Sequence, residues 1–191
     1  MEVPTFIQFD PDLVARAMKS WYWYIGDPDD PEVEALENEV LAVTSFGDIV
    51  LWDGYCSRIL GTRAFNYDYG DRTREAIDNS LNSFEFRQKY LYFNDAGFAE
   101  QVAELNGPLE RNQCYGPRIF PAAGGNASDP TNYGRFDVDE QICVSALIWK
   151  LRERLPDHEW DFVDRVLGER GRINEILREA FPHLATTRQK P

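Results

Sequence analysis

One stretch decides the fold of this chain: Ser45-Phe46-Gly47-Asp48-Ile49-Val50-Leu51-Trp52-Asp53-Gly54. Residues 46–52 are rich in aromatic and β-branched side chains, which is typical of a buried strand. Asp53-Gly54 indicates a hairpin turn, because glycine readily adopts the positive φ angle that such a turn requires. We therefore expect a strand from Phe46 to Trp52 and a return strand from Tyr55 to Leu60.

A second informative segment, residues 113–155, predicts a strand, a turn at two glycines and, farther on, a helix. Residues 113–121 predict a strand, Gly124-Gly125 interrupts it, and residues 132–138 predict a further edge strand. A helix is then expected from Ile142 to Leu155. Helical spacing and capping signals predict the other helices: one from Asp10-Pro11 to before Gly26, a short acidic one over residues 32–40, and two more over residues 73–90 and 98–105. Residues 67–71 are typical of a loop.

Together these elements predict an α+β fold, in which a small, mostly antiparallel sheet packs against several helices and a C-terminal helical extension follows. The length of 191 residues favours a single domain over residues 1–191. We expect its core at about residues 43–155, N-terminal helices within 1–42 and C-terminal helices within 156–184. A hydrophobic content of 43% is enough to bury a core.

The charge of the chain restricts its partners. The formal net charge is −13, from 33 acidic and 20 basic residues. Such a chain repels nucleic acid and anionic membrane surfaces and attracts basic partners. Three widely spaced cysteines without a CxxC pair argue against a thiolate zinc site and a disulfide framework. Since no signal peptide and no membrane-spanning apolar run are visible, we expect a cytoplasmic protein that binds neither nucleic acid nor membrane.

No pattern in the sequence predicts catalysis. The two histidines, His158 and His183, stand in the polar C-terminal region, where a solvated role is expected. The lysine of a phosphate-binding loop does not follow Gly124-Gly125. Carboxylate pairs such as Asp137 with Asp139, or Asp68 with Asp71, arise by chance in so acidic a chain. We therefore assign no catalytic residue, no metal and no cofactor.

A binding surface is the remaining interpretation. An acidic face with aromatic side chains suits a basic protein partner, because electrostatic attraction speeds association and buried aromatic anchors supply affinity. The run Trp21-Tyr22-Trp23-Tyr24 is also compatible with a helix end packed into the core. We assign partner contacts to one aromatic residue and four nearby acids: Trp23, Asp27, Asp29, Asp30 and Glu32.

The order of motifs resembles a known family. Phe46-Gly47-Asp48-Ile49-Val50-Leu51-Trp52, a helical middle, Cys114-Tyr115-Gly116, Pro121-Ala122-Ala123-Gly124-Gly125 and the segment through Leu151 look like the C-terminal domain of the bacterial type VI secretion DNase-immunity family. The resemblance covers roughly Val43 to Leu155. It departs at both ends, because the family places a second domain before this one and the residues after Pro156 are outside the pattern.

The resemblance implies a small cytoplasmic immunity protein, or antitoxin, that binds and neutralises a cognate secreted toxin. It carries over no catalytic residue. The acidity favours a nuclease as the toxin, with a nucleotide- or NAD-degrading enzyme second. The Smi1/Knr4-like immunity superfamily is a second match to the same motifs. Two other classes stay open: a carboxylate-dependent hydrolase of a small substrate, and a housekeeping adaptor.

Overall fold

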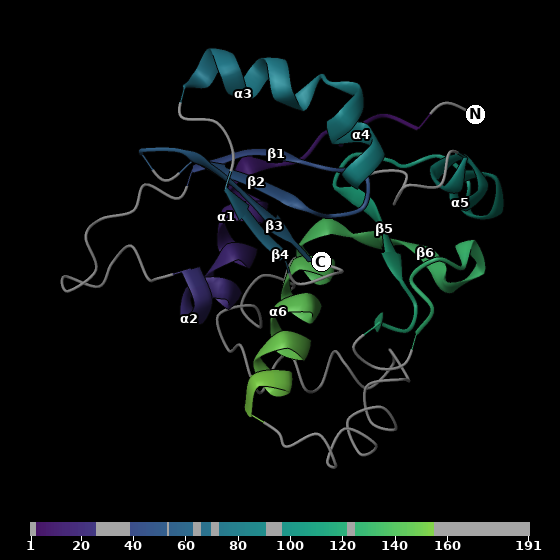
Figure 1. Cartoon of the computed structure of the whole chain (residues 1–191). Helices are drawn as coiled ribbons and strands as arrows, with labels where there is room; N and C mark the ends of the chain where they lie inside the picture. The colour runs from purple at the N-terminus through teal and green to yellow at the C-terminus, as the bar shows by residue number, and fades with distance from the viewer. Residues whose placement is uncertain are drawn as a thin grey trace, which may run out of the picture.

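An antiparallel sheet forms the centre of the molecule in this computed structural model (Figure 1). The structure describes residues 3–25, 39–52, 54–62, 66–69, 73–90, 97–121 and 125–154. Four strands follow one another in the order β1-β2-β3-β4: Glu39–Val43, Ile49–Trp52, Ser57–Gly61 and Asn66–Tyr69. Each pairs with the next antiparallel neighbour, and the register of β1 on β2 shifts between Val40 and Ala42.

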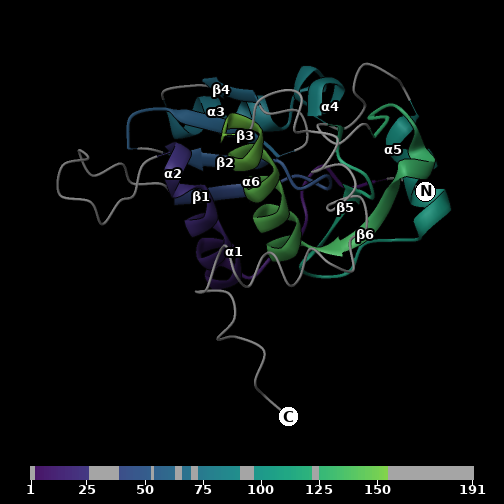
Figure 2. The same cartoon turned by 90° about the horizontal axis from the view of Figure 1, so that it is seen from below.

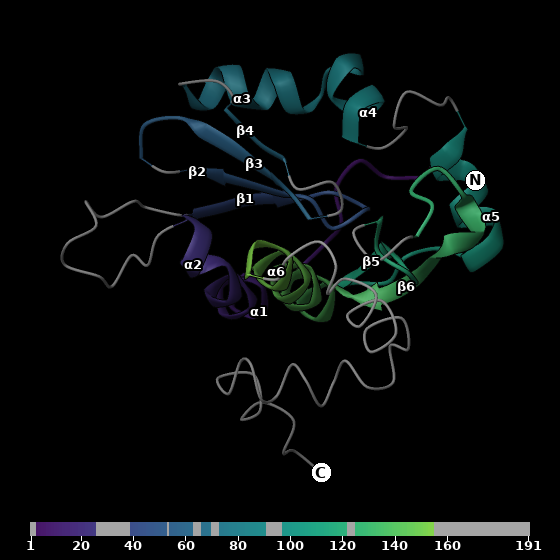
Figure 3. The ribbon, with the colours of Figure 1, turned by 60° about the horizontal axis from the view of Figure 1, so that its bottom comes forward.

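Both faces of this sheet are covered, which explains why the apolar run in β2 is continuous. Ile49 and Leu51 face a cluster that includes residues of α1 (Pro11–Met18) and α6 (Val138–Arg154). Val50 faces the other way, where it packs with Ile59 and with Phe86 of α4. Figure 3 shows the resulting layers, with α3 and α4 on one face of the sheet and α1 and α6 on the other.

The N-terminal helical run is anchored to α6. Asp10 caps α1 by accepting a hydrogen bond from the Asp12 backbone N–H at 3.0 Å. The chain continues without a break through the 3-10 turn η1 (Lys19–Trp21) into α2 (Tyr22–Ile25). Trp21 is fully buried, and its indole N–H donates to the Ile142 carbonyl of α6 at 3.0 Å.

Two helices replace the single one expected over residues 73–90. They are α3 (Arg74–Leu81) and α4 (Phe84–Tyr90). Thr73 caps α3 by accepting from the Ala76 N–H at 3.2 Å. Ser83 accepts from the Phe86 N–H at 3.1 Å, so a second capping residue starts a new helix within the expected one.

A second unit lies beside the central sheet. It consists of α5 (Phe98–Asn106), the strand pair β5 (Gln113–Pro117) and β6 (Tyr133–Asp137), and the 3-10 turn η3 (Pro130–Asn132). Seen from below, α5 and the two strands stand at the opposite end of the molecule from α2 (Figure 2). The chain passes from β6 directly into α6, with Val138 as its first residue.

An extended N-terminal segment connects the two units. Ile7 donates its N–H to the Val43 carbonyl at 3.0 Å, and Ser45 donates its N–H to the Thr5 carbonyl at 3.0 Å. Farther along, Asn112 beside β5 donates its N–H to the Gln8 carbonyl at 2.8 Å. The segment therefore holds the end of β1 and the start of β5 together.

The expected α+β class is confirmed, as are the antiparallel return of the chain after β2 and the strand before α6. Several local predictions were wrong. Residues 67–69, expected as loop, pair with β3, and residues 39–40, expected at the end of a helix, begin β1. The strands expected from Phe46, from Tyr55 and up to Pro121 are shorter, because β2 begins at Ile49, β3 begins at Ser57 and β5 ends at Pro117, whereas the helix expected from Ile142 already begins at Val138. The predicted C-terminal helices over residues 156–184 lie outside the described residues.

Candidate partner-binding surface

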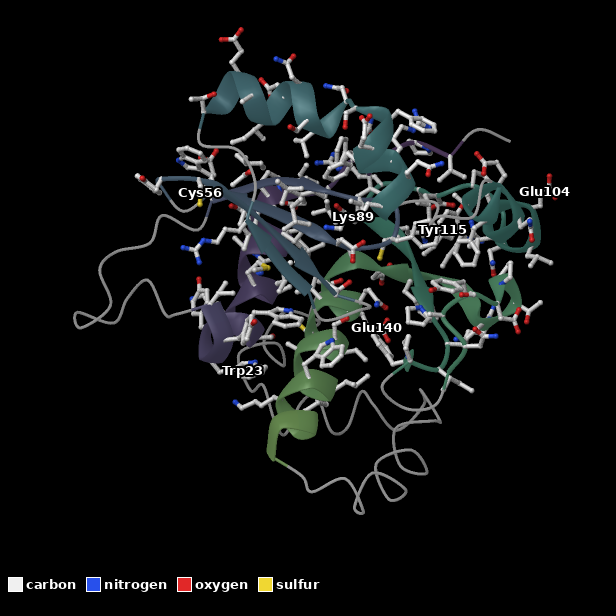
Figure 4. The ribbon with its side chains drawn as sticks, in the orientation of Figure 1. Trp23, Cys56, Lys89, Glu104, Tyr115 and Glu140 are labelled. Carbon is white, nitrogen blue, oxygen red and sulfur yellow. The ribbon has the colours of Figure 1, made fainter. Side chains whose placement is uncertain are left out.

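Trp23 lies on α2, immediately after the buried anchor Trp21. The two indole rings stack, with centroids 6.3 Å apart and planes inclined by 15°. Figure 4 shows Trp23 on α2, far from Glu104 of α5 at the other end of the molecule. Because the backbone on either side is fixed by buried Trp21 and Ile25, the position of Trp23 is set by the packing of these two residues in the core, where Trp21 of η1 bonds to α6.

Trp23 is partly buried, and its neighbour Tyr24 is 36% exposed. Their ring centroids are 5.6 Å apart at 56°. The expectation that this aromatic run is a helix end packed into the core therefore fits Trp21, while Trp23 and Tyr24 lie at its outer edge. The sequence did not identify Tyr24 as a surface residue. Tyr24 follows Trp21 by three residues, so helical spacing places both on the same face and does not show that only Trp21 is buried.

The indole N–H of Trp23 is buried and has no hydrogen-bond acceptor within the described part of the chain. Trp21, by contrast, satisfies its own N–H on α6. An unpaired buried donor is uncommon and costs roughly 1–3 kcal/mol.

The four acids assigned to partner contacts are Asp27, Asp29, Asp30 and Glu32, and they lie outside the described residues. Their sequence position is nevertheless informative. Nine of the 33 acidic residues, but none of the 20 basic ones, stand between Lys19 and Arg58, so this fifth of the chain supplies −9 of the net charge of −13. Six of these nine stand in the sequence between α2 and β1, and a seventh, Glu39, begins β1, whereas a general solubilising charge would be spread along the chain.

The Phe46-Gly47-Asp48 motif forms the turn between β1 and β2. Phe46 is fully buried among Phe98, Tyr115 and Tyr133, with ring centroids 5.6–5.9 Å away. Gly47 has a φ of +79°, and an added Cβ would lie 3.2 Å from Gln141 Cγ and 3.3 Å from Cys114 Sγ. The turn therefore contacts both units and α6, so the Phe46-Gly47-Asp48 motif has a structural role.

Asp48 is 2% exposed and belongs to the same turn. Its carboxylate accepts the Thr62 backbone N–H at 3.0 Å, and the Thr62 hydroxyl donates to the Gly47 carbonyl at 3.1 Å. Trp149 of α6 donates its indole N–H to the Thr62 carbonyl at 3.4 Å. These bonds fix the end of β3 against the turn and α6, so the acid serves the framework.

Cys143 of α6 is the most strongly perturbed acid among the described residues. Burial, opposed by a hydrogen bond from the Ser20 hydroxyl at 3.2 Å and reinforced by the negative charges of Asp139 and Glu140, raises the pKa of its thiol from 9.0 to about 12. The thiolate is the nucleophilic form. Cys143 is therefore an inert core residue.

We expect iodoacetamide at pH 8 to leave Cys143 unmodified in the folded protein and to alkylate it readily in denaturant. Peptide mass spectrometry measures both. The raised pKa also predicts a loss of stability as the pH rises from about 9 toward 12, because the unfolded thiol releases its proton there and the folded one does not. Substitution of Cys143 by alanine removes this component, and rapid labelling of the folded chain would contradict the assignment.

Other candidate chemical groups also have structural explanations. The Tyr115 hydroxyl donates to the Gly107 carbonyl at 2.7 Å, and burial raises its pKa although the charge of Arg135 opposes the rise. The Asp129 carboxylate accepts from the hydroxyl and the N–H of Thr131, which lowers its pKa. Both groups hold turns around β5 and β6.

Among the residues that the structure describes, no three His, Cys, Asp or Glu side chains are grouped as metal ligands. No helix in these ranges combines the length and the apolar character needed to cross a lipid bilayer. His158, His183 and Gly124 lie outside the described residues. An added Cβ on Gly125 would lie 1.9 Å from the Ile119 carbonyl oxygen, so this glycine allows a close backbone approach.

Comparison with known proteins identifies no family. No family model matches the sequence, and no curated protein matches it. Among solved structures, the chain is similar to the crystal structure of Atu4351 from Agrobacterium tumefaciens, with a TM-score of 0.47 and 18% sequence identity. The match covers 71% of this chain and 62% of the other, so this chain spans less than two thirds of that protein's length. A likeness at this level establishes no shared function.

Proposed function

We propose that this protein is a cytoplasmic immunity protein that binds a cognate basic toxin and blocks its active site. The observation that carries the proposal is the position of the charge in the sequence: seven acidic residues and no basic one stand between Ile25 and Val40, directly after a helix end that carries Trp23 and Tyr24. Acidic surroundings steer a basic partner, and aromatic anchors retain it.

A nuclease is the toxin that this charge suits best. A nuclease active site binds a polyanion and is itself basic, so an acidic surface competes with the substrate for the same groups. The motif resemblance to the DNase-immunity family points to the same class. The perturbed groups of the described residues have structural roles, which leaves stoichiometric binding as the activity to be tested.

The direct test uses a toxin whose gene adjoins this one, which the proposal predicts to exist. The purified protein should bind that toxin with one-to-one stoichiometry and inhibit its nuclease activity, and co-expression should rescue cells that produce the toxin. Isothermal titration and a DNA- or RNA-cleavage assay measure these effects. No binding, or binding without inhibition and rescue, would overturn the proposal.

Reversing the four assigned acids, Asp27, Asp29, Asp30 and Glu32, to lysine should weaken toxin binding about tenfold or more, mainly by slowing association, and should flatten its dependence on salt. The matched control reverses four exposed acids elsewhere, on α3, α4 and α5: Glu75, Asp78, Glu85 and Glu104. Both variants change the net charge equally. Equal losses in the two variants would show that only overall charge matters and would exclude the assigned location.

A further inference from the structure

We propose that Asn106 is a deamidation site that the folded structure blocks, so that its conversion to aspartate and isoaspartate records opening of the end of α5. Asn106-Gly107 is the only Asn-Gly dipeptide in the chain. Glycine has no Cβ to hinder its own backbone nitrogen, so this nitrogen reaches the preceding side-chain amide more easily than in other Asn dipeptides. Asn106 is the last residue of α5 and is partly buried.

The reaction requires the backbone nitrogen of Gly107 to attack Cγ of Asn106. This step forms an N–Cγ bond in a cyclic succinimide and breaks the Cγ–Nδ2 bond, and Nδ2 leaves as ammonia with the proton of the Gly107 nitrogen. Water then opens the ring at either carbonyl and gives aspartate or isoaspartate. The net change is the addition of water and the loss of ammonia.

The helical conformation turns the two reacting groups away from each other. The side chain of a helical residue tilts toward the helix N-terminus. The Asn106 side-chain amide follows this direction and donates to the Val102 carbonyl at 2.8 Å. The Gly107 N–H donates to the Ala103 carbonyl, also at 2.8 Å. Both bonds must break before the nitrogen can reach Cγ, so cyclisation requires the last turn of α5 to unwind.

Two residues of the β5 region restrain the same turn from outside the helix. The guanidinium of Arg118, which directly follows β5, donates to Asn106 Oδ1 at 3.0 Å. The Arg118 backbone is itself fixed, because its N–H donates to the Asn132 carbonyl at 2.6 Å. The Tyr115 hydroxyl donates to the Gly107 carbonyl at 2.7 Å. Opening the α5 end therefore also means releasing it from β5, which makes the reactive conformation rare.

Deamidation would damage the contacts that block it. An aspartate at position 106 has no N–H for the Val102 carbonyl and places negative charge at the C-terminal end of α5, where the helix dipole disfavours it. An isoaspartate lengthens the backbone, so the hydrogen bonds of Gly107 lose their geometry. Because Tyr115 packs against Phe46 with ring centroids 5.6 Å apart, the damage reaches the junction of the two units.

The test compares the rate of deamidation in the folded protein with that of the chain in guanidinium chloride, at the same mildly alkaline pH, by peptide mass spectrometry. We expect Asn106 to react about tenfold or more slowly in the folded protein, because only opened molecules react. Asn82 is the internal control. Its amide also donates to a carbonyl of its own helix, that of Asp78 at 2.7 Å, but a serine follows it. In the unfolded chain Asn82 should therefore react more slowly than Asn106.

Arg118→Met tests the restraint from β5. It removes one hydrogen bond but keeps an alkyl side chain, and it should speed deamidation of the folded protein roughly two- to tenfold. The matched control is Arg111→Met, which removes the same charge from an exposed residue between α5 and β5 and should leave the rate unchanged.

Circular dichroism establishes that each variant is folded, and the wild-type comparison decides the matter if Arg118→Met is not. Equal rates at Asn106 in the folded and the unfolded wild type would overturn the inference, as would no reaction there in the unfolded chain. Equal rates in the two arginine variants would show that Arg118 does not restrain the site.

Discussion

Replacing Phe46 by alanine should destabilise the protein by about 3–5 kcal/mol, a large part of the roughly 5–15 kcal/mol that stabilises an ordinary domain. Phe46 is fully buried and packs at 5.6–5.9 Å against three rings, Phe98, Tyr115 and Tyr133. Those rings come from α5, β5 and β6, so the substitution opens a cavity where the second unit meets the turn of the first.

Urea unfolding monitored by circular dichroism measures this loss. Phe84→Ala removes the same side chain from an exposed position and should change the free energy of unfolding by less than about 0.5 kcal/mol. A loss below about 1 kcal/mol for Phe46→Ala would show that the aromatic cluster does not hold the two units together.

Trp21→Ala should be similarly severe, about 3–5 kcal/mol, because it empties a fully buried site between the N-terminal helices and α6. Trp21→Phe separates the causes. It keeps most of the apolar volume but leaves the Ile142 carbonyl without its indole donor, at a cost of roughly 1–3 kcal/mol.

The same two substitutions test how Trp23 is positioned. Trp21→Phe should weaken toxin binding less than Trp23→Leu while destabilising the fold more, because Trp21 acts only by supporting its neighbour. Urea unfolding and titration with the toxin give the two quantities. Equal free energies of unfolding for Trp21→Ala and Trp21→Phe would contradict the contributions expected here from packing and from the indole hydrogen bond.

The parts of the fold with a strong local sequence pattern could be predicted from the sequence. The pairing of one strand with another could not. The apolar run of β2 and the Asp53-Gly54 turn identify the central hairpin locally. The polar strand β4, in contrast, is a strand because its backbone pairs with β3. Residues 39–40 fit a helical spacing, but their pairing with Leu51 and Trp52 decides their conformation.

The candidate site divides in the same way. The amino-acid sequence alone reveals the acidic stretch and the aromatic run, because each consists of residues that are close together along the chain. The separation of Trp21 as a buried anchor from Trp23 and Tyr24 at the edge depends on α6, which is more than a hundred residues away. The buried role of Asp48 likewise depends on Thr62, a partner that no spacing rule indicates.

The N-terminal segment has a consequence for synthesis in the cell. Gln8 meets Asn112, Ser20 meets Cys143 and Trp21 meets Ile142, so each of these residues is synthesised more than a hundred residues before its partner. The β1-β2-β3-β4 meander, whose contacts are local, can form while the chain is still growing. The aromatic helix end therefore reaches its final packing only after α6 emerges, long after its own residues have been synthesised.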